Sequence, residues 1–357
     1  NFINKMIKYF LYISLIFLNF SLSFAQNIDI QEDIKIGFVC ELEKKILKNS
    51  EYNYQTFLAK DLNEKNLDKF EIDAKQPEKL LINGLSMFLS KNDKMLSTHR
   101  SHAHYLAKGG NLFRMISEFH GGQAGCSQGM GGSMHLIDRE CGFEGATAIV
   151  GNTIPIANGI AMSQKLSKKD NITVVCLGEG ATEEGVFYEA LNLASLKKLP
   201  VIFFVENNKY SVYSPLNVRQ SENRSIINIA KAHGIETFAG DGNKVKEVLD
   251  VCRMATVHAR KKCEPCLIEL STYRFLEHCG PNNDDHLHYR PKEELAYWSK
   301  NDVIQNTKLF LTRYNIEVEK LEQLVQTETT NKLSKAFVSA KQSSLPSLER
   351  SASYEYA

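Results

Sequence analysis

Two short polar segments, each placed just after an apolar run, have the residue types of a phosphate and metal site. They are Gly178-Glu179-Gly180 and Asn207-Asn208, and 208 − 178 = 30 positions separate the first glycine from the second asparagine. Glycines let a backbone approach a ligand closely, and the N–H groups that begin a helix favour phosphate. A carboxylate and an amide supply the hard oxygens that magnesium prefers. The two segments together predict a diphosphate and magnesium site, whereas a Gly-x-Gly turn alone would not.

The elements around these segments place them at one edge of a sheet. The apolar, β-branched runs at 172–177 and 201–205 predict buried strands. Between them, Val186, Phe187, Ala190, Leu191 and Ala194 recur at helical spacing, and Pro200 ends that helix. Strand, glycine turn, helix and strand form a βαβ unit with parallel strands. Both polar segments then emerge at the carboxyl ends, where open α/β sheets bind their ligands.

The rest of the chain extends this pattern. Further strands are expected at 235–238 and 267–270, and helices within 26–75, over 76–96 and over 291–335. Glycine and histidine become frequent from 98 to 132, which favours functional loops. The serine-rich residues 343–357 predict an extended tail.

Composition is that of an ordinary globular protein. The chain has 357 residues, 43% of them hydrophobic and 24% charged, with a formal net charge of +1. That balance argues against nucleic acid or an anionic membrane surface as a partner. The eight cysteines are scattered, which indicates reduced thiols rather than a disulfide framework. Cys263 and Cys266 form a lone C-x-x-C pair, for which a metal or redox role is the less favoured interpretation.

Residues 1–25 resemble a secretory signal peptide. Lys5 and Lys8 precede an apolar stretch from Phe10 to Phe24, and Ala25 follows it. We interpret this segment as an extension or a mistaken start, because the remainder of the chain indicates a cytoplasmic protein.

Longer segments resemble the alpha subunits of the thiamine-diphosphate-dependent pyruvate, branched-chain and acetoin dehydrogenases. Gly-acid-Gly followed about thirty residues later by Asn-Asn is similar to the thiamine-diphosphate fingerprint of that family. The resemblance covers roughly residues 35–357, and the other segments that carry it are Thr98-His-Arg-Ser-His102, Gly125-Cys-Ser-Gln-Gly-Met-Gly-Gly-Ser-Met-His135, Ile149-Val-Gly151, Ile154-Pro155, Leu199-Pro200, Glu206-Asn-Asn-Lys-Tyr210 and Thr272-Tyr-Arg274.

The resemblance implies a fold, an activity and partners. The expected fold is an α/β thiamine-diphosphate-binding domain over 26–335, with a mostly parallel sheet flanked by helices, helical N- and C-terminal segments, and a tail at 336–357. The expected activity is oxidative decarboxylation of a pyruvate-like 2-oxo acid, with thiamine diphosphate and Mg²⁺ as cofactors and acyl transfer to a lipoyl carrier. The implied partners are a beta subunit, in a two-alpha two-beta heterotetramer, and a lipoyl acyltransferase. In this family the beta subunit carries the glutamate that activates the cofactor.

The resemblance also implies site residues, each at a position that matches the family. Magnesium ligands would be Glu179, Asn208 and the carbonyl of Tyr210. His278 and His102 would be catalytic. Cofactor binding would involve His99, Arg100, Ala148, Val150, Gly178, Glu179, Gly180, Ala181, Asn208 and His278. For His102, His104 and His135 a structural role is an equal alternative.

Four departures from the family keep alternatives open. Glu179 replaces an aspartate, Ile72 and Leu276 replace histidines, and Cys279 occupies a regulatory serine position. The alternatives to an active pyruvate-type subunit are a subunit of an acetoin-cleaving or other carbonyl-cleaving thiamine enzyme, and a cofactor-binding subunit that has lost catalysis.

Overall fold

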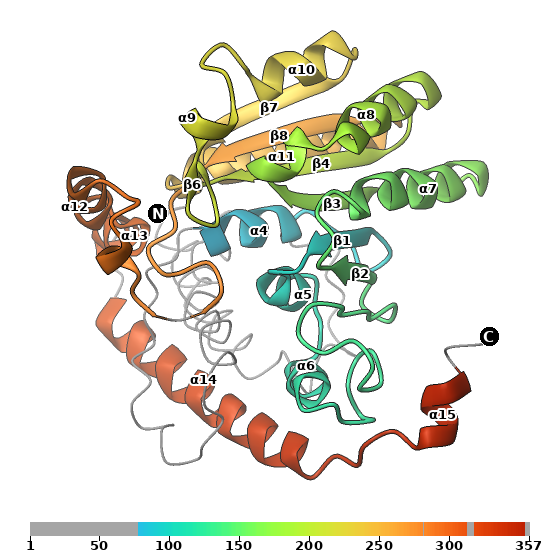
Figure 1. The fold of residues 1–357 in the computed structure, drawn as a ribbon, viewed down its shortest axis with the longest axis vertical. Coiled ribbons are helices and arrows are strands. Elements are labelled where there is room, and N and C mark those ends of the chain that lie inside the picture. The colour runs from blue at the N-terminus through green and yellow to red at the C-terminus, as the bar shows by residue number, and fades with distance from the viewer. Residues whose placement is uncertain (1–77, 281, 313–317, 354–357) are drawn as a thin grey trace, which may run out of the picture.

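The computed structural model describes residues 78–280, 282–312 and 318–353, drawn as coloured ribbon in Figure 1. The signal-like segment, the helix expected within 26–75, and Ile72 lie outside the described residues. Within the described part of the chain, helices cover both faces of one large sheet (Figure 1). No helix there is long and apolar enough to cross a lipid bilayer.

The large sheet has six strands in the order β2-β1-β3-β4-β8-β7, and every neighbouring pair is parallel. The strands predicted at 172–177, 201–205, 235–238 and 267–270 are confirmed as β3, β4, β7 and β8, and the parallel pairing of β3 with β4 is confirmed. The bounds are β1 Lys94–Thr98, β2 Phe143–Thr147, β3 Thr173–Gly178, β4 Val201–Asn207, β7 Glu236–Asp241 and β8 Cys266–Ser271.

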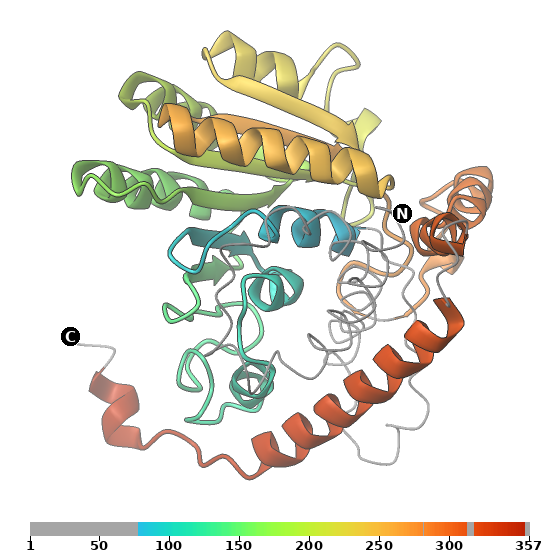
Figure 2. The ribbon, with the colours of Figure 1, turned by 180° about the vertical axis from the view of Figure 1, so that it is seen from behind.

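Alternate side chains of the central strands enter two different cores. In β3, Val175 and Leu177 pack with α7 (Thr153–Leu166), α8 (Gly185–Lys197) and α10 (Ile226–Ala232). Val174 and Cys176 pack with α4 (Glu78–Ser86) and α11 (Val245–Lys262) on the opposite face, as Figures 1 and 2 show. Each fully buried aliphatic side chain of this kind contributes about 1.5–3 kcal/mol. Burial on both faces explains why these strands are continuous apolar runs. The predicted fold class is confirmed.

The helix predicted over 76–96 is too long. Residues 76–96 were expected to form one helix, but α4 ends at Ser86 and β1 begins at Lys94. Asp93 ends the connecting turn, because its carboxylate accepts the N–H of Ser90 at 2.6 Å. Residues 98–132 are also not only loops, since they contain α5 (His102–Ala107) and α6 (Leu112–Phe119).

The C-terminal region is helical further than expected. The helices predicted over 291–335 are confirmed as α12 (Lys292–Lys300), α13 (Val303–Thr312) and α14 (Val318–Lys341). The boundary at 335 is wrong, because it falls inside α14, where Phe337 and Ala340 pack on Ile116 of α6. The prediction of a wholly extended tail is also wrong, since α15 covers Leu348–Ser353 (Figure 1).

Glu118 organises the glycine-rich loop that follows α6. Its side chain is fully buried, and its carboxylate accepts four backbone N–H groups. The donors and distances are Ser127 at 2.8 Å, Gly129 at 2.9 Å, Gly131 at 2.7 Å and Gly132 at 3.2 Å. A charged acceptor of this kind stabilises a loop more than a neutral one does.

Replacing Glu118 with glutamine is expected to destabilise the protein by about 3 kcal/mol, because the amide cannot accept all four bonds and hydrogen bonds to a charged group contribute about 1.5–3 kcal/mol each. The measurement is the unfolding midpoint in denaturant. Glu140→Gln is the matched control, since the Glu140 side chain is 82% exposed. Equal midpoints for Glu118→Gln and wild type would show that the buried charge does not hold the loop.

Candidate active site

A cavity of ≈ 280 Å³ lies at the carboxyl ends of the central strands. Its lining includes Thr98 of β1, Thr147 of β2, Leu177 of β3 and Glu206 of β4. Strand order reverses between β1 and β3, because the chain leaves β1 for β2 on one side and returns to β3 on the other. Ligand sites of open α/β sheets form at such a switch point. The cavity therefore lies at the edge of the sheet where the sequence predicted the two polar segments.

The first polar segment begins a short 3-10 helix, η3 (Glu179–Glu183), directly after β3. A Cβ atom at Gly178 would meet no atom within 4 Å, so the glycine leaves room in the cavity. Glu179 is only 2% exposed. Burial raises the pKa of the Glu179 carboxyl, although the neighbouring Arg219 guanidinium opposes that change.

The second polar segment enters a tight hairpin, β5 (Tyr210–Ser211) and β6 (Ser214–Pro215). The Asn208 Oδ1 atom accepts the N–H of Tyr210 at 3.0 Å, which fixes the amide at the cavity wall. Asn207 points elsewhere, because its Nδ2 donates to Glu269 at 2.8 Å. Only the second asparagine of the pair therefore lines the cavity.

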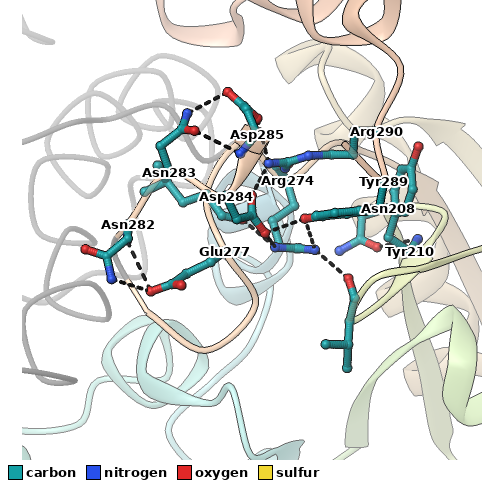
Figure 3. A network of polar contacts seen from close by, with 12 residues as sticks. Asn208, Tyr210, Arg274, Glu277, Asn282, Asn283, Asp284, Asp285, Tyr289 and Arg290 are labelled. Carbon is teal, nitrogen blue, oxygen red and sulfur yellow. Dashed lines mark hydrogen bonds and ion pairs between the residues drawn. The ribbon is translucent and has the colours of Figure 1, made fainter. Parts of the chain in front are cut away.

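A loop after β8 brings His278 to the cavity. A buried ion network holds this loop, as Figure 3 shows: Asp284 is bound by Arg290 and lies 3.8 Å from Arg274. All three side chains are at most 4% exposed. Tyr289 also donates to Asp284, at 2.5 Å, and burial raises the pKa of Tyr289 to about 12, so the phenol keeps its proton.

The same network reaches the hairpin. Arg274 donates to the carbonyl of Val212 at 2.8 Å. Val212 has φ 54°, a left-handed conformation that a β-branched residue rarely adopts. Such a conformation persists only where surrounding contacts maintain it, at a cost of about 1–3 kcal/mol. Arg274 therefore couples the hairpin next to Asn208 with the loop that carries His278.

Two histidine rings meet across the cavity. The Nε2 atoms of His99 and His278 are 3.1 Å apart, so one of them must donate and the other accept. Burial, together with the nearby Arg100, lowers the pKa of His99. A neutral His99 can accept or release a proton at its Nε2, which makes the pair suited to proton movement.

The structure brings together ten of the twelve residues that the resemblance implied. The residues that line the cavity are His99, Arg100, Val150, Gly178, Glu179, Gly180, Ala181, Asn208, Tyr210 and His278. Two lie apart from it. Ala148 is exposed and is not part of the lining. His102 packs on Phe119 and contacts the Ser133 carbonyl through Nε2 at 2.9 Å, a geometry that holds the glycine-rich loop.

Two residues at the site, Glu206 and Arg219, were not identified as site residues from the sequence. Glu206 lines the cavity, with its Oε2 atom 3.3 Å from Nε2 of His104, an ion-pair distance at an angle unsuited to a hydrogen bond. The His104 Nδ1 atom lies 2.9 Å from Ser97 Oγ. Arg219 contacts Glu179 at 2.6 Å. Glu206 directly precedes Asn207, so its place at the end of a predicted strand could have indicated that it lies at the site. Nothing near Arg219 in the sequence links it to Glu179.

The two cysteines of the C-x-x-C pair lie in different settings. Cys263 caps α11 in a left-handed conformation with φ 53°, and Cys266 is buried in β8. Among the described residues no group of three or more His, Cys, Asp or Glu side chains could hold a metal ion.

The cavity suits a diphosphate with a hard cation. Glu179, Asn208 and Tyr210 line the cavity, and their carboxylate, amide and backbone carbonyl are oxygen groups that could hold such a cation. The guanidinium of Arg100 also lines the cavity, and Arg219 Nη1 lies 3.5 Å from where a Cβ at Gly180 would be. Guanidinium groups match phosphate oxygens well. The donors present therefore fit the cofactor that the resemblance implies.

Comparison with known proteins supports the same conclusion. Residues 55–349 match the family described as "Dehydrogenase E1 component". The chain is 32% identical over 253 residues to the pyruvate dehydrogenase E1 component subunit alpha of Rickettsia bellii, covering 70% of this chain and 76% of the relative. It is 34% identical over 227 residues to the subunit of that name from Rickettsia typhi, covering 64% and 68%. It is 35% identical over 242 residues to the chloroplastic pyruvate dehydrogenase E1 component subunit alpha-3 of Arabidopsis thaliana, covering 66% of this chain and 56% of the relative.

The chain belongs to the dehydrogenase E1 component family, the thiamine-diphosphate-dependent part of 2-oxo acid dehydrogenases. Within that family it is of the alpha-subunit type, and it is an oxidoreductase of the 2-oxo acid dehydrogenase class. The predicted resemblance is confirmed.

Proposed function

We propose that this chain is the alpha subunit of a pyruvate-type dehydrogenase, and that it acts in a two-alpha two-beta assembly with a beta subunit. It binds thiamine diphosphate with Mg²⁺ and passes the acyl group to a lipoyl carrier on an acyltransferase. The observation that carries the proposal is one cavity whose lining includes the proposed oxygen ligands, Arg100 and a histidine pair. The names of the relatives support pyruvate as the substrate.

The chain's own residues divide into binding and proton-transfer groups. Glu179, Asn208 and the Tyr210 carbonyl hold the magnesium, and Arg100 with the N–H groups of Gly180 and Ala181 binds the diphosphate. Val150, which is 52% exposed, offers an apolar surface to the pyrimidine ring. When bound, thiamine diphosphate supplies the electron sink that lets a 2-oxo acid lose carbon dioxide.

Proton transfer near the substrate falls to the histidine pair. His278 lies at the cavity on a loop fixed by buried ions, and His99 lies 3.1 Å away at the carboxyl end of β1. His99 can therefore orient the ring of His278 and exchange a proton with it. His102 remains a candidate for a catalytic role, although its Nε2 contact to the Ser133 carbonyl supports a positioning role.

We also propose a reducing compartment, with the cytoplasm as the working location. Five of the seven described cysteines are buried and all seven are free thiols. Burial raises the pKa of Cys126 to about 11, so that thiol is unreactive at neutral pH.

The chain alone is expected to decarboxylate at least about 100-fold more slowly than the reconstituted pair, because general acid–base groups contribute about 100- to 10,000-fold and one of them belongs to the beta subunit. The test mixes purified alpha and beta chains and follows carbon dioxide release from pyruvate and from branched-chain 2-oxo acids, and in parallel acetaldehyde release from acetoin, which has no carboxylate to lose. Pyruvate should react fastest in the pair. Equal rates for the lone chain and the pair would contradict the two-subunit site, and preferential cleavage of acetoin would contradict the substrate.

A further inference from the structure

Glu179 already has a cationic partner of its own. Its Oε1 atom accepts a hydrogen bond from Nη2 of Arg219 at 2.6 Å, and both side chains are largely buried, at 3% and 12% exposed. The other terminal nitrogen of Arg219 binds Glu183. The guanidinium therefore bridges two carboxylates at the edge of the cavity.

The position of Arg219 is set by contacts outside the pair. Arg219 ends the short helix α9 (Leu216–Arg219), and its Nε donates to the carbonyl of Ser214 at 3.1 Å. Gln220 donates to Glu183 at 2.7 Å, which fixes the second carboxylate as well. Because these bonds do not involve Glu179, the guanidinium would keep two anchoring contacts, to Ser214 and Glu183, if Glu179 moved away.

A buried carboxylate needs a partner of opposite charge, since an unpaired buried charge is costly. At Glu179 the partner is a side chain of the same protein, and the carboxylate it binds is the one proposed as a magnesium ligand. Magnesium binds oxygen at about 2.0–2.1 Å and requires regular octahedral geometry. A guanidinium at 2.6 Å from Oε1 and a magnesium ion on the same carboxylate repel each other.

We propose that Arg219 is a built-in counter-ion that a divalent cation must displace from Glu179, with Glu183 retaining the released guanidinium. This inference rests on the proposed function, because it assumes that Glu179 is a ligand. It also explains why a glutamate can stand at position 179, where the family has an aspartate. The glutamate side chain reaches one methylene further than aspartate, and the Arg219 contact uses that reach.

The test is a calorimetric titration of the assembled alpha–beta pair with Mg²⁺ alone, without thiamine diphosphate. Arg219→Gln removes the competing cation and should tighten Mg²⁺ binding at least about tenfold. Arg219→Lys keeps a positive charge and should remain close to wild type. Arg224→Gln removes a similar charge nearby, where Arg224 bonds the carbonyl of Thr182, and should change the affinity less than about twofold. Unchanged or weaker Mg²⁺ binding by Arg219→Gln would overturn the proposal.

A second variant covers the case in which Arg219→Gln does not fold. Glu179→Asp keeps the carboxylate but shortens its reach, so the pair with Arg219 should break and Mg²⁺ should bind more tightly. Mg²⁺ affinity equal to that of wild type in Glu179→Asp would also overturn the proposal. If wild type binds Mg²⁺ with thiamine diphosphate but no variant changes the affinity for Mg²⁺ alone, this inference alone fails. If wild type binds no Mg²⁺ even in the presence of thiamine diphosphate, both the proposed metal site and this inference fail.

Discussion

Asp284→Ala is expected to reduce turnover of the assembled enzyme by on the order of 100-fold, because it leaves two buried arginines without their shared anion. Arg290 binds Asp284 directly and Arg274 lies 3.8 Å from it, and each is at most 4% exposed. Removing one partner of a buried ion pair costs about 3–5 kcal/mol. The loop that carries His278 is the segment that this network holds (Figure 3), so we expect loss of loop order before loss of the central sheet.

The measurement combines turnover with limited proteolysis. Residues 276–290 should become the first cleavage region in Asp284→Ala, while the strands β3 and β4 stay resistant. Asp285→Ala is the matched control, because Asp285 is 38% exposed and bonds Arg290 at 2.9 Å without touching Arg274. If both variants lose activity equally, or if neither does, the buried network does not position the loop.

Asn208→Ala should weaken metal-dependent binding of thiamine diphosphate by on the order of 100-fold, about 2.8 kcal/mol at 1.4 kcal/mol for each factor of ten. The substitution removes an oxygen that lines the cavity, and it also frees the N–H of Tyr210, whose carbonyl is the neighbouring proposed ligand. The fold should survive, since Asn208 follows β4 rather than lying within the sheet.

The neighbouring asparagine provides a control of the same residue type. Asn207 bonds Glu269 and the N–H of Lys209, and it does not line the cavity. Asn207→Ala should therefore change stability more than cofactor affinity. Titration calorimetry with thiamine diphosphate at fixed Mg²⁺ compares the two variants. A larger loss of affinity in Asn207→Ala than in Asn208→Ala would mean that the metal site was assigned to the wrong side of the strand.

Three of the four strands that the sequence predicted, β3, β4 and β8, are largely buried, whereas the fourth, β7, is a partly exposed edge strand. β3 and β4 are continuous apolar runs because helices cover each side of them. β1 (Lys94–Thr98) and β2 (Phe143–Thr147) were not predicted, since lysine, serine, threonine, glutamate and glycine interrupt their apolar pattern. β2 is an edge strand that needs less apolar surface. Helix α7 was missed because Pro155 and Gly159 obscure its periodicity, although proline is compatible with a first helical turn.

Some residues of the site could likewise be predicted from the sequence and others could not. Glu179 and Asn208 were predictable, because each directly follows a strand and the βαβ connection brings strand ends together. The charged residues that contact Glu179 or hold the neighbouring loop could not be predicted. Arg219 lies 219 − 179 = 40 positions after Glu179 on a short helix, and Asp284 meets Arg274 through a loop without regular structure. Contacts between distant segments depend on tertiary packing, which no local pattern encodes.

Glu179 decides between the active and the inactive interpretation of this subunit. In an active site Glu179→Ala should weaken Mg²⁺ binding at least about tenfold, because it removes a charged ligand from a buried position. In a subunit that has lost catalysis, the contact between Glu179 and Arg219 would be a permanent ion pair, and the same change would alter stability alone.

The most direct measurement is the equilibrium binding of thiamine diphosphate to the assembled alpha–beta pair, titrated with and without Mg²⁺. We predict saturable binding at the cavity that requires Mg²⁺, that is lost in Asn208→Ala and that is retained in Asn207→Ala. Binding that is absent, or that is equally tight without Mg²⁺ and in Asn208→Ala, would contradict the assignment of this cavity as the cofactor site.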